Sequence, residues 1–410
     1  MKSTAQHPPG TDTAVSRQAR TLRGKAAVVG IGETTYYRHG QAPEPEFKLT
    51  LRAILAACAD AGIDPREIDG FSSFHDERAA PPRLAAALGI RELRFSNLQW
   101  GGGGGGGSAA VANAAAAVAT GMADCVVVFR GLAQGQFLRY GRIGATERTV
   151  SGDMAYQMPY GAMTPGQRYS MKAMRFMHEH GVRQEALRAI ALASYHHAQS
   201  NPRAVMYGKP LDAATYDASR WIMEPHHLYD CCMENDGAAA IVLVSAERAR
   251  QQRHPPAYVL GAAAGGPYRA AAAAANGPSY GSAHFGSVAP HLYAMAGIGP
   301  ADVDVVQCYE NFTGGVLMSL AEHGFFAPEE ANEFLVPDNL IAGRGKLPLN
   351  TSGGNLAECY MHGMELHLEA VRQIRGQSPN QVADAEVALV AAGPMVTPVS
   401  TIVYGAQSTL

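Results

Sequence analysis

The sequence predicts an α/β protein made of two similar halves, in which strands alternate with helices. Short apolar runs bounded by turn residues are typical of buried strands, and here they alternate with segments of helical periodicity. The nonapeptide AGIDPREID at residues 61–69 returns as AGIGPADVD at residues 296–304, and an apolar strand follows each copy. This repeat indicates a duplicated fold with mixed or parallel sheets covered on both faces. Two unrelated α/β domains are the alternative.

In the first half, a helix at residues 49–61 ends before Gly62, a common helix terminator. A run of seven glycines, residues 101–107, precedes an alanine-rich helix. The strands predicted around these helices are 25–31, 67–74, 125–129 and 237–244.

The second half repeats the pattern after the end of a long insertion. Its predicted strands are 258–261, 303–308, 386–391 and 399–404. The resulting organisation is a flexible tail at 1–24, a first half at 25–134 and 236–256, an insertion at 135–235, and a second half at 257–410.

The insertion is rich in methionine and aromatic residues, which adapt to irregular apolar space. An ordinary core helix is the simpler interpretation of this composition. A wide apolar channel for a bulky substrate is the other. The residues concerned are Met154, Tyr156, Met158, Tyr160, Met163, Tyr169, Met171, Met174, Phe176 and Met177.

Composition limits the possible partners. The chain has 410 residues, 47% hydrophobic and 17% charged, with a formal net charge of −3. Such a balance gives no attraction to nucleic acid or to an anionic membrane. No apolar run is long enough to span a bilayer, and the first residues lack the apolar core of a secretory signal. The six cysteines show no disulfide-framework spacing, so we expect a cytoplasmic protein.

The glycine run marks a site with unusual chemistry. A helix N-terminus carries partial positive charge and suits an anion or a nucleophilic thiolate. Residues 101–107 offer backbone only, and no acidic residue follows at the distance of a dinucleotide-binding motif. We therefore interpret the run as close backbone packing beside a ligand.

The segment from Asn97 through the glycine run to Thr120-Gly121 and Cys125 resembles the nucleophile segment of thiolases, most closely the lipid-transfer-protein type. Counting back from Thr120-Gly121 places the family's nucleophilic cysteine at Gly104. The resemblance covers most of residues 25–405. It implies two five-stranded mixed sheets with helices in an αβαβα layering.

The remaining family motifs can be recognised in this chain, but their catalytic residues are replaced. Tyr309-Glu310-Asn311-Phe312 stands where thiolases have Asn-Glu-Ala-Phe. Tyr360 takes the position of the histidine in the Gly-His-Pro motif, and the closing segment 390–394 contains no cysteine. The Asp-Gly-Ala-Ala signature survives within residues 235–240.

Without a thiolate, acyl transfer through a covalent thioester is not expected. A pocket that stabilises a thioester enolate still supports aldol cleavage. We expect Tyr309 to take a proton from a β-hydroxyl group and Tyr360 to protonate the enolate carbon, or the reverse. A free tyrosine is a weak base at neutral pH, so a cationic or hydrogen-bonding helper is needed. The candidate helpers are His362 and Glu310, and the candidate substrate-binding residues are Gly104, Gly105, Gly353, Gly354 and Asn355.

This pattern resembles the thiolase-fold aldolases of steroid side-chain degradation. The resemblance implies a β-hydroxy acyl-CoA substrate on a steroid ring, cleaved to a ring ketone and propionyl-CoA. Coenzyme A is then part of the substrate, and this chain binds no cofactor of its own. The resemblance also implies a homodimer and a small partner with an OB-fold and zinc ribbon, of the DUF35 type. No metal site is expected, because His226-His227 and Cys231-Cys232 are adjacent pairs without tetrahedral zinc spacing.

Other hypotheses remain open from the sequence. Cys308 and Cys359 lie beside the two tyrosines, and either one acting as a relocated nucleophile would make the protein an acyltransferase. A non-catalytic carrier of acyl-CoA or lipid is a further alternative. Both tyrosines would then be ordinary core residues.

Overall fold

The computed structural model describes residues 21–101, 103–137, 155–268, 270 and 279–410. Its strands are β1 (Ala26–Glu33), β2 (Tyr37–Arg38), β3 (Gly70–Phe74), β4 (Phe95–Gln99), β5 (Cys125–Ala133), β6 (Trp221–Met223), β7 (His226–His227), β8 (Asn235–Ser245), β9 (Ala257–Gly265), β10 (Val305–Cys308), β11 (Val387–Ala392) and β12 (Val399–Gly405). Its helices are α2 (Glu46–Ala61), α3 (Pro81–Leu88), α4 (Gly107–Ala119), α5 (Pro165–His180), α6 (Gln184–Ala198), α7 (Ala213–Asp217), α8 (Ala246–Ala249), α9 (Ala289–Ala296), α10 (Thr313–Glu322), α11 (Ala331–Phe334), α12 (Pro337–Leu340), α13 (Gly354–Ala357) and α14 (Met364–Arg375).

The strands confirm the predicted α/β fold with mixed pairing. The first half supplies five strands in the order β1-β8-β5-β3-β4, and the second half continues the order as β10-β11-β12-β9. The pairs β3–β4, β3–β5 and β10–β11 are parallel. A two-residue antiparallel pairing between β1 and β9 joins the halves, so they form one continuous sheet instead of two separate ones.

The second half has four strands in its described part, where five were expected. The fifth position, beside β10, is reduced to an isolated parallel bridge between Val306 and Leu349. Pro348 precedes Leu349 and has no N–H to donate, so a ladder of hydrogen bonds cannot continue through it.

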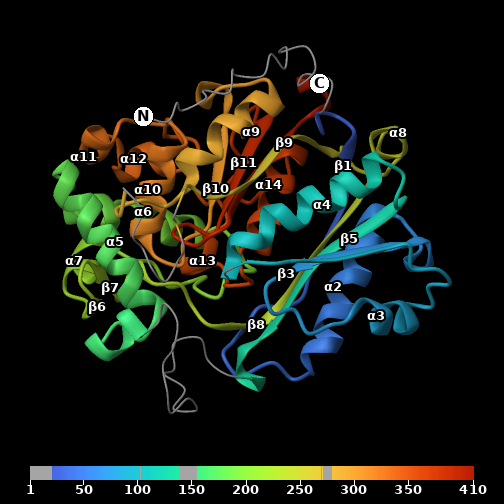
Figure 1. The fold of residues 1–410 in the computed structure, drawn as a ribbon, viewed down its shortest axis with the longest axis horizontal. Helices are drawn as coiled ribbons and strands as arrows, with labels where there is room; N and C mark the ends of the chain where they lie inside the picture. Colours follow the sequence, from blue (N-terminus) through green and yellow to red (C-terminus); the bar gives the residue numbers. More distant parts are fainter. Residues whose placement is uncertain (1–20, 102, 138–154, 269, 271–278) are drawn as a thin grey trace, which may run out of the picture.

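Helices cover the outer faces of the sheet, and other helices pack between its two halves. Helices α4 and α14 contact strands of both halves, α2 packs on β1, β8 and β5, and α9 packs on β9 and β12. Figure 1 shows α4 crossing the middle of the molecule, between the blue and cyan first half and the orange and red second half. This arrangement is the predicted αβαβα layering.

The repeated nonapeptide adopts the same structure in both halves. Each copy begins at a helix C-terminus with a left-handed glycine, Gly62 (φ 71°) or Gly297 (φ 67°), and continues into a short 3₁₀ turn. Its final aspartate then caps a neighbouring strand. Asp69 accepts the backbone N–H of Cys125 at the start of β5, and Asp304 accepts that of Val387 at the start of β11. The duplication inferred from sequence is therefore structural.

Helices α5, α6 and α7 form the core of the insertion and pack beside the second half (Figure 1). The methionine-rich segment is partly an ordinary core helix, and its interpretation as a channel for a bulky substrate stays a prediction. Phe176 and Met177 are buried in the core, whereas Met171 and Met174 are exposed on the opposite side of α5. Met154 lies outside the described residues. Throughout the described chain, we find no helix that combines the length and hydropathy needed to cross a membrane.

Candidate active site

Two buried tyrosines meet at the centre of the molecule. Tyr309 follows β10 directly, and Tyr360 lies in the loop between α13 and α14. Their hydroxyl oxygens are hydrogen-bonded at 2.7 Å. The backbone N–H of Tyr309 donates to Ala391, and that of Tyr360 donates to the side chain of Asn235. Strands β11 and β8, one from each half, thus hold the two tyrosines in place.

The ring of Tyr309 fills the space that a side chain at position 104 would need. A Cβ added to Gly104 would lie 2.5 Å from Cζ of Tyr309. A Cβ added to Gly363 would lie 2.8 Å from Cδ2 of the same ring. Gly104, the position at which thiolases carry their nucleophile, therefore leaves room for a tyrosine ring and for no side chain of its own.

Three other predicted substrate-binding residues build the frame around the tyrosines. Gly105 packs against Val396, whose Cγ2 would lie 2.5 Å from an added Cβ. Gly354 has φ 55° and faces Glu310, whose Oε2 would lie 2.5 Å from an added Cβ. Gly353 (φ 110°) caps the start of α13. Positive φ and these close approaches both require glycine.

Asn355 ties the loops on either side of the site together. Its Oδ1 accepts the backbone N–H of Glu310 at 3.0 Å, and its Nδ2 donates to the carboxyl group of Glu365. Because its amide is used in this way, Asn355 holds the Glu310 segment against the start of α13. Its role as a substrate ligand stays a prediction.

His362 lies beside Tyr360, with ring centroids 5.2 Å apart and an edge-on geometry. Its Nδ1 is 3.0 Å from Nη2 of Arg130, a fully buried arginine on β5. Burial, followed by the charge of Arg130, holds the pKa of His362 well below its usual range. His362 is therefore neutral, and the cation near the tyrosines is Arg130, which the sequence analysis did not select.

Glu310 is buried, and the hydroxyl group of Ser194 donates a hydrogen bond to its Oε1 at 2.8 Å. Burial raises the pKa of Glu310 to about 8. A carboxyl group with this pKa is protonated at neutral pH. Glu310 therefore adds no negative charge beside Tyr309 at that pH, and its contact with Ser194 links the site to α6.

The protonated Glu310 predicts a pH-dependent stability. The unfolded chain releases this proton near pH 4.5, whereas the folded chain keeps it to about pH 8. The folded state binds more protons in this window, so the free energy of unfolding falls as pH rises through it, by at most about 1.4 kcal/mol per pH unit. We expect Glu310→Gln to reduce this slope and to stabilise the protein by about 1–3 kcal/mol at pH 8.

Urea unfolding at pH 5 to 8 measures this effect. The amide oxygen of glutamine can still accept the hydrogen bond from Ser194, so packing is retained. Exposed Glu247 on α8 gives the matched control Glu247→Gln, which should leave the slope unchanged. An unchanged slope in Glu310→Gln would show that Glu310 ionises alike in both states.

The two cysteines proposed as relocated nucleophiles are poor candidates. Cys308 and Cys359 are fully buried, and burial raises the pKa of both thiols far above their usual range. A neutral thiol is not the reactive form. The His226-His227 pair is also used structurally, with Nδ1 of His226 bonded to Ser170 and Nδ1 of His227 bonded to the Ser219 carbonyl. Among the described residues, no cluster of three or more histidine, cysteine or acidic side chains could hold a metal ion.

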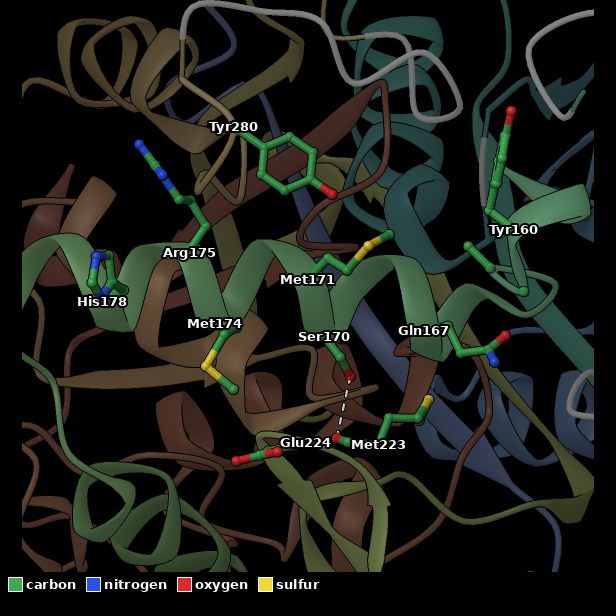
Figure 2. A pocket seen from close by; sticks show the side chains of 12 residues that line it. Tyr160, Gln167, Ser170, Met171, Met174, Arg175, His178, Met223, Glu224 and Tyr280 are labelled. Atoms are coloured by element: carbon green, nitrogen blue, oxygen red, sulfur yellow. Dashed lines mark hydrogen bonds between the residues drawn. The ribbon is translucent and has the colours of Figure 1, made fainter. Parts of the chain in front are cut away.

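An open pocket of about 630 Å³ lies on the outer side of α5, away from the tyrosine pair. Figure 2 shows Arg175 on the side of α5 that carries Tyr280, Met174 on the side toward Glu224, and Tyr160 near the start of the helix. None of the predicted site residues lines this pocket. Its walls are Tyr160, Gly161, Ala162, Gln167, Ser170, Met171, Met174, Arg175, His178, Met223, Glu224 and Tyr280.

Comparisons with known proteins agree with this fold. Residues 271–406 match a family described as "Thiolase C-terminal domain-like". A steroid side-chain-cleaving aldolase of Thermomonospora curvata is 41% identical over 394 residues, covering 94% of this chain and 99% of the relative. A 17-hydroxy-3-oxo-4-pregnene-20-carboxyl-CoA lyase of Mycobacterium tuberculosis is 40% identical, covering 94% of this chain and all of the relative. The solved structure titled Ltp2-ChsH2(DUF35) aldolase superposes with a TM-score of 0.88 at 40% identity, covering 95% of this chain and 100% of that one.

A thiolase fold without its nucleophilic cysteine, with paired tyrosines in the catalytic frame, defines the class of this protein. The chain belongs to the thiolase-like family. Within that family it is a carbon–carbon lyase of the aldolase type.

Proposed function

We propose that this chain cleaves a β-hydroxy acyl-CoA by a retro-aldol reaction in which Tyr309 and Tyr360 move the protons. The observation that carries the proposal is the 2.7 Å hydrogen bond between the two hydroxyl groups, at the position where a thiolase has its nucleophile. The names of the relatives support a steroid side-chain CoA ester as substrate. The products are then a ring ketone and propionyl-CoA, and no covalent intermediate forms.

The hydroxyl pair suits a proton relay. The β-hydroxyl proton passes to Tyr309, the Tyr309 proton passes to Tyr360, and the Tyr360 proton reaches the α-carbon. These transfers are concerted with Cα–Cβ cleavage, so the electron pair of the breaking bond delocalises into the thioester as enolate character and takes up that proton at the α-carbon, and no separate ion forms. Each tyrosine ends the cycle with one proton, so no reagent besides the substrate is consumed. The protons also balance if the two tyrosines exchange roles, so that Tyr360 receives the β-hydroxyl proton and Tyr309 protonates the α-carbon.

A relay also removes the energetic difficulty of using tyrosine as a base. Burial raises the pKa of Tyr309 well above its usual range, so a free phenolate is costly there. In the relay Tyr309 gives up one proton as it receives another, so a fully formed phenolate is not required. The high pKa is then compatible with catalysis at neutral pH.

The experiment mixes the purified chain with a β-hydroxy steroid acyl-CoA, with and without a co-expressed DUF35 protein. Ring ketone and propionyl-CoA are followed by chromatography, and the intact protein mass is recorded during turnover. We expect both products in equal amounts and no acyl adduct on the protein. An acyl adduct would favour the acyltransferase, and ligand binding without turnover in either preparation would favour the carrier.

We also propose that the chain forms a homodimer through strand β4, in addition to binding a DUF35 partner. Within the residues that the structure describes, strand β4 pairs with β3 alone and forms an edge of the sheet. Leu98 on this strand is 53% exposed, and Trp100 just beyond it is 83% exposed. An exposed, apolar edge strand invites pairing with an identical strand. The neighbouring Ltp2-ChsH2(DUF35) aldolase supports the DUF35 partner.

Leu98→Lys should convert the dimer to a monomer, because a charged residue on an edge strand opposes pairing. Sedimentation equilibrium of the variant and of the unmodified chain measures this change. Leu55→Lys on α2 is the matched control, since Leu55 is similarly exposed on a different face. A dimer that persists in Leu98→Lys would place the interface elsewhere.

A further inference from the structure

Lys172 is a buried cation on helix α5 of the insertion. Its side chain is 4% exposed, and lysine is rarely buried to this degree without a partner. Its Nζ lies 3.1 Å from Nε2 of His284 and 3.5 Å from the carbonyl oxygen of Tyr280. Burial lowers the pKa of Lys172 to about 8, although the charge of Glu322 raises it. The group is therefore still mostly an ammonium ion at neutral pH, and it donates to the ring of His284.

The ring of His284 connects Lys172 with the loop between β11 and β12. Its Nδ1 lies 2.8 Å from the carbonyl oxygen of Val396 and 3.0 Å from Oγ1 of Thr397. A carbonyl oxygen can only accept, so Nδ1 carries the proton of the ring and Nε2 accepts from Lys172. Burial, followed by the charge of Lys172, lowers the pKa of His284 to about 4, so the ring is neutral. Both ring nitrogens are thus engaged, one by the insertion and one by the loop.

The backbone fixes the ring of His284 in this orientation. His284 has φ 77°, a conformation that few residues other than glycine adopt. The carboxyl group of Glu322 accepts the N–H of Ala283 at 2.8 Å and that of Gly286 at 3.1 Å. The N–H of Met395 in turn donates to the carbonyl group of Ala283 at 3.0 Å. The turn that carries His284 is therefore attached to the loop between β11 and β12 by its backbone as well as by the ring.

This loop closes behind the glycine run. A Cβ added to Gly105 would lie 2.5 Å from Cγ2 of Val396 and 2.6 Å from the carbonyl oxygen of Pro398. On the tyrosine side, a Cβ added to Gly104 would lie 2.5 Å from Cζ of Tyr309. The glycine backbone is thus packed between the loop and the tyrosine ring, so a shift of the loop is passed on to the site.

We propose that Lys172 is a positioning residue, which acts through His284 to hold the loop between β11 and β12 against the glycine run. The run then stays in contact with the ring of Tyr309. This inference rests on the proposed function, in which Tyr309 carries a proton. A displacement of about 1 Å at a reacting group can cost about 10²-fold in rate. Through this contact the insertion contributes to the active site.

Replacement of the ammonium group tests the contact. Lys172→Met keeps the apolar stem and removes the donor. We expect kcat to fall about 10- to 10²-fold and KM to change less than about 3-fold, because Lys172 reaches the site through other side chains. Lys172→Arg restores a permanently charged donor and should return kcat to within about 3-fold of the unmodified chain. Lys48→Met, at an exposed lysine on α2, is the matched control and should leave kcat unchanged.

A double-mutant cycle separates a shared role from two independent ones. Asparagine tolerates the positive φ of residue 284, and its amide can still donate to Val396, but it is too short to reach Lys172. We expect His284→Asn to lose as much activity as Lys172→Met, and the double variant to lose no more than either single one. Losses that multiply in the double variant would overturn the proposal, because the two residues would then act separately.

The contact itself is measured by NMR of the full chain labelled with ¹⁵N-histidine, with His284→Asn identifying the signals. We expect a neutral ring in the Nδ1–H form from pH 6 to 8. In Lys172→Met the Nε2 signal should move toward that of a nitrogen without a hydrogen bond, and the pKa of the ring should rise because the neighbouring cation is gone. An Nε2–H ring, or an unchanged spectrum in Lys172→Met, would overturn the proposal without any activity assay.

Failure of the proposed function is recognised separately. Tyr309→Phe and Tyr360→Phe would then retain full lyase activity in the same assay. If the tyrosine variants are inactive and Lys172→Met keeps the kcat of the unmodified chain, only the positioning role of Lys172 is wrong.

Discussion

Tyr309→Phe and Tyr360→Phe are each expected to lower the kcat of aldol cleavage by at least about 10³-fold. The relay passes every proton through both hydroxyl groups, which are 2.7 Å apart. Removing either hydroxyl interrupts the path from the β-hydroxyl group to the α-carbon. Because phenylalanine retains the ring and loses only the hydroxyl group, KM should change much less than kcat.

The fold should survive these changes. Phenylalanine keeps the ring of residue 309 in the space beside Gly104, and each variant loses one hydrogen bond worth about 1 kcal/mol. Tyr293→Phe is the matched control, because its hydroxyl donates to the His323 carbonyl at a site remote from the tyrosine pair. Single-turnover rates and thermal unfolding of the three variants test the prediction. Full activity in both tyrosine variants would refute the relay.

The second large effect is expected at Gly104. In Gly104→Ala the new Cβ would lie 2.5 Å from Cζ of Tyr309, well inside van der Waals contact. The ring must move, so we expect destabilisation of about 1–3 kcal/mol. The displaced hydroxyl of Tyr309 should also lower the lyase rate by about 10²-fold or more.

Gly286→Ala is the control for this substitution, because an added Cβ at Gly286 meets nothing within 4 Å. Thermal unfolding and kcat are measured for both alanine variants. The result that contradicts the prediction is a Gly104→Ala protein as stable and as active as the control. That outcome would mean that the ring of Tyr309 has free space in which to withdraw.

The frame of the site could be predicted from sequence because it consists of local backbone features. The 353–355 turn and the repeated nonapeptide each need the backbone conformation that their glycines allow, and Gly103–Gly106 form a tight 3₁₀ turn without side chains. The pairing of Tyr309 with Tyr360 was predictable through the family motifs, although residues 309 and 360 meet only in the folded chain.

Arg130 was missed because its partners are far away in sequence. His362 lies 232 residues further along the chain, and no local pattern links the two. A signal was present, however, since Arg130 interrupts the apolar run of β5. A charged residue in a buried strand needs a partner of opposite charge or a hydrogen-bond acceptor, so Arg130 is predicted to contact polar groups inside the protein. Strand β4 was missed for a different reason, because exposed and half-buried residues alternate along it at the sheet edge.

The occupation of the Gly104 space by Tyr309 also constrains the evolutionary history of the site. A cysteine restored at position 104 would collide with the ring, whereas a smaller residue at 309 alone would leave a cavity and no nucleophile. Each single step away from the present pair is therefore disfavoured, and only the two changes together recreate space for a thiol. Residues 104 and 309 are therefore sterically coupled, and a substitution at either one alone does not recreate a thiolase nucleophile site.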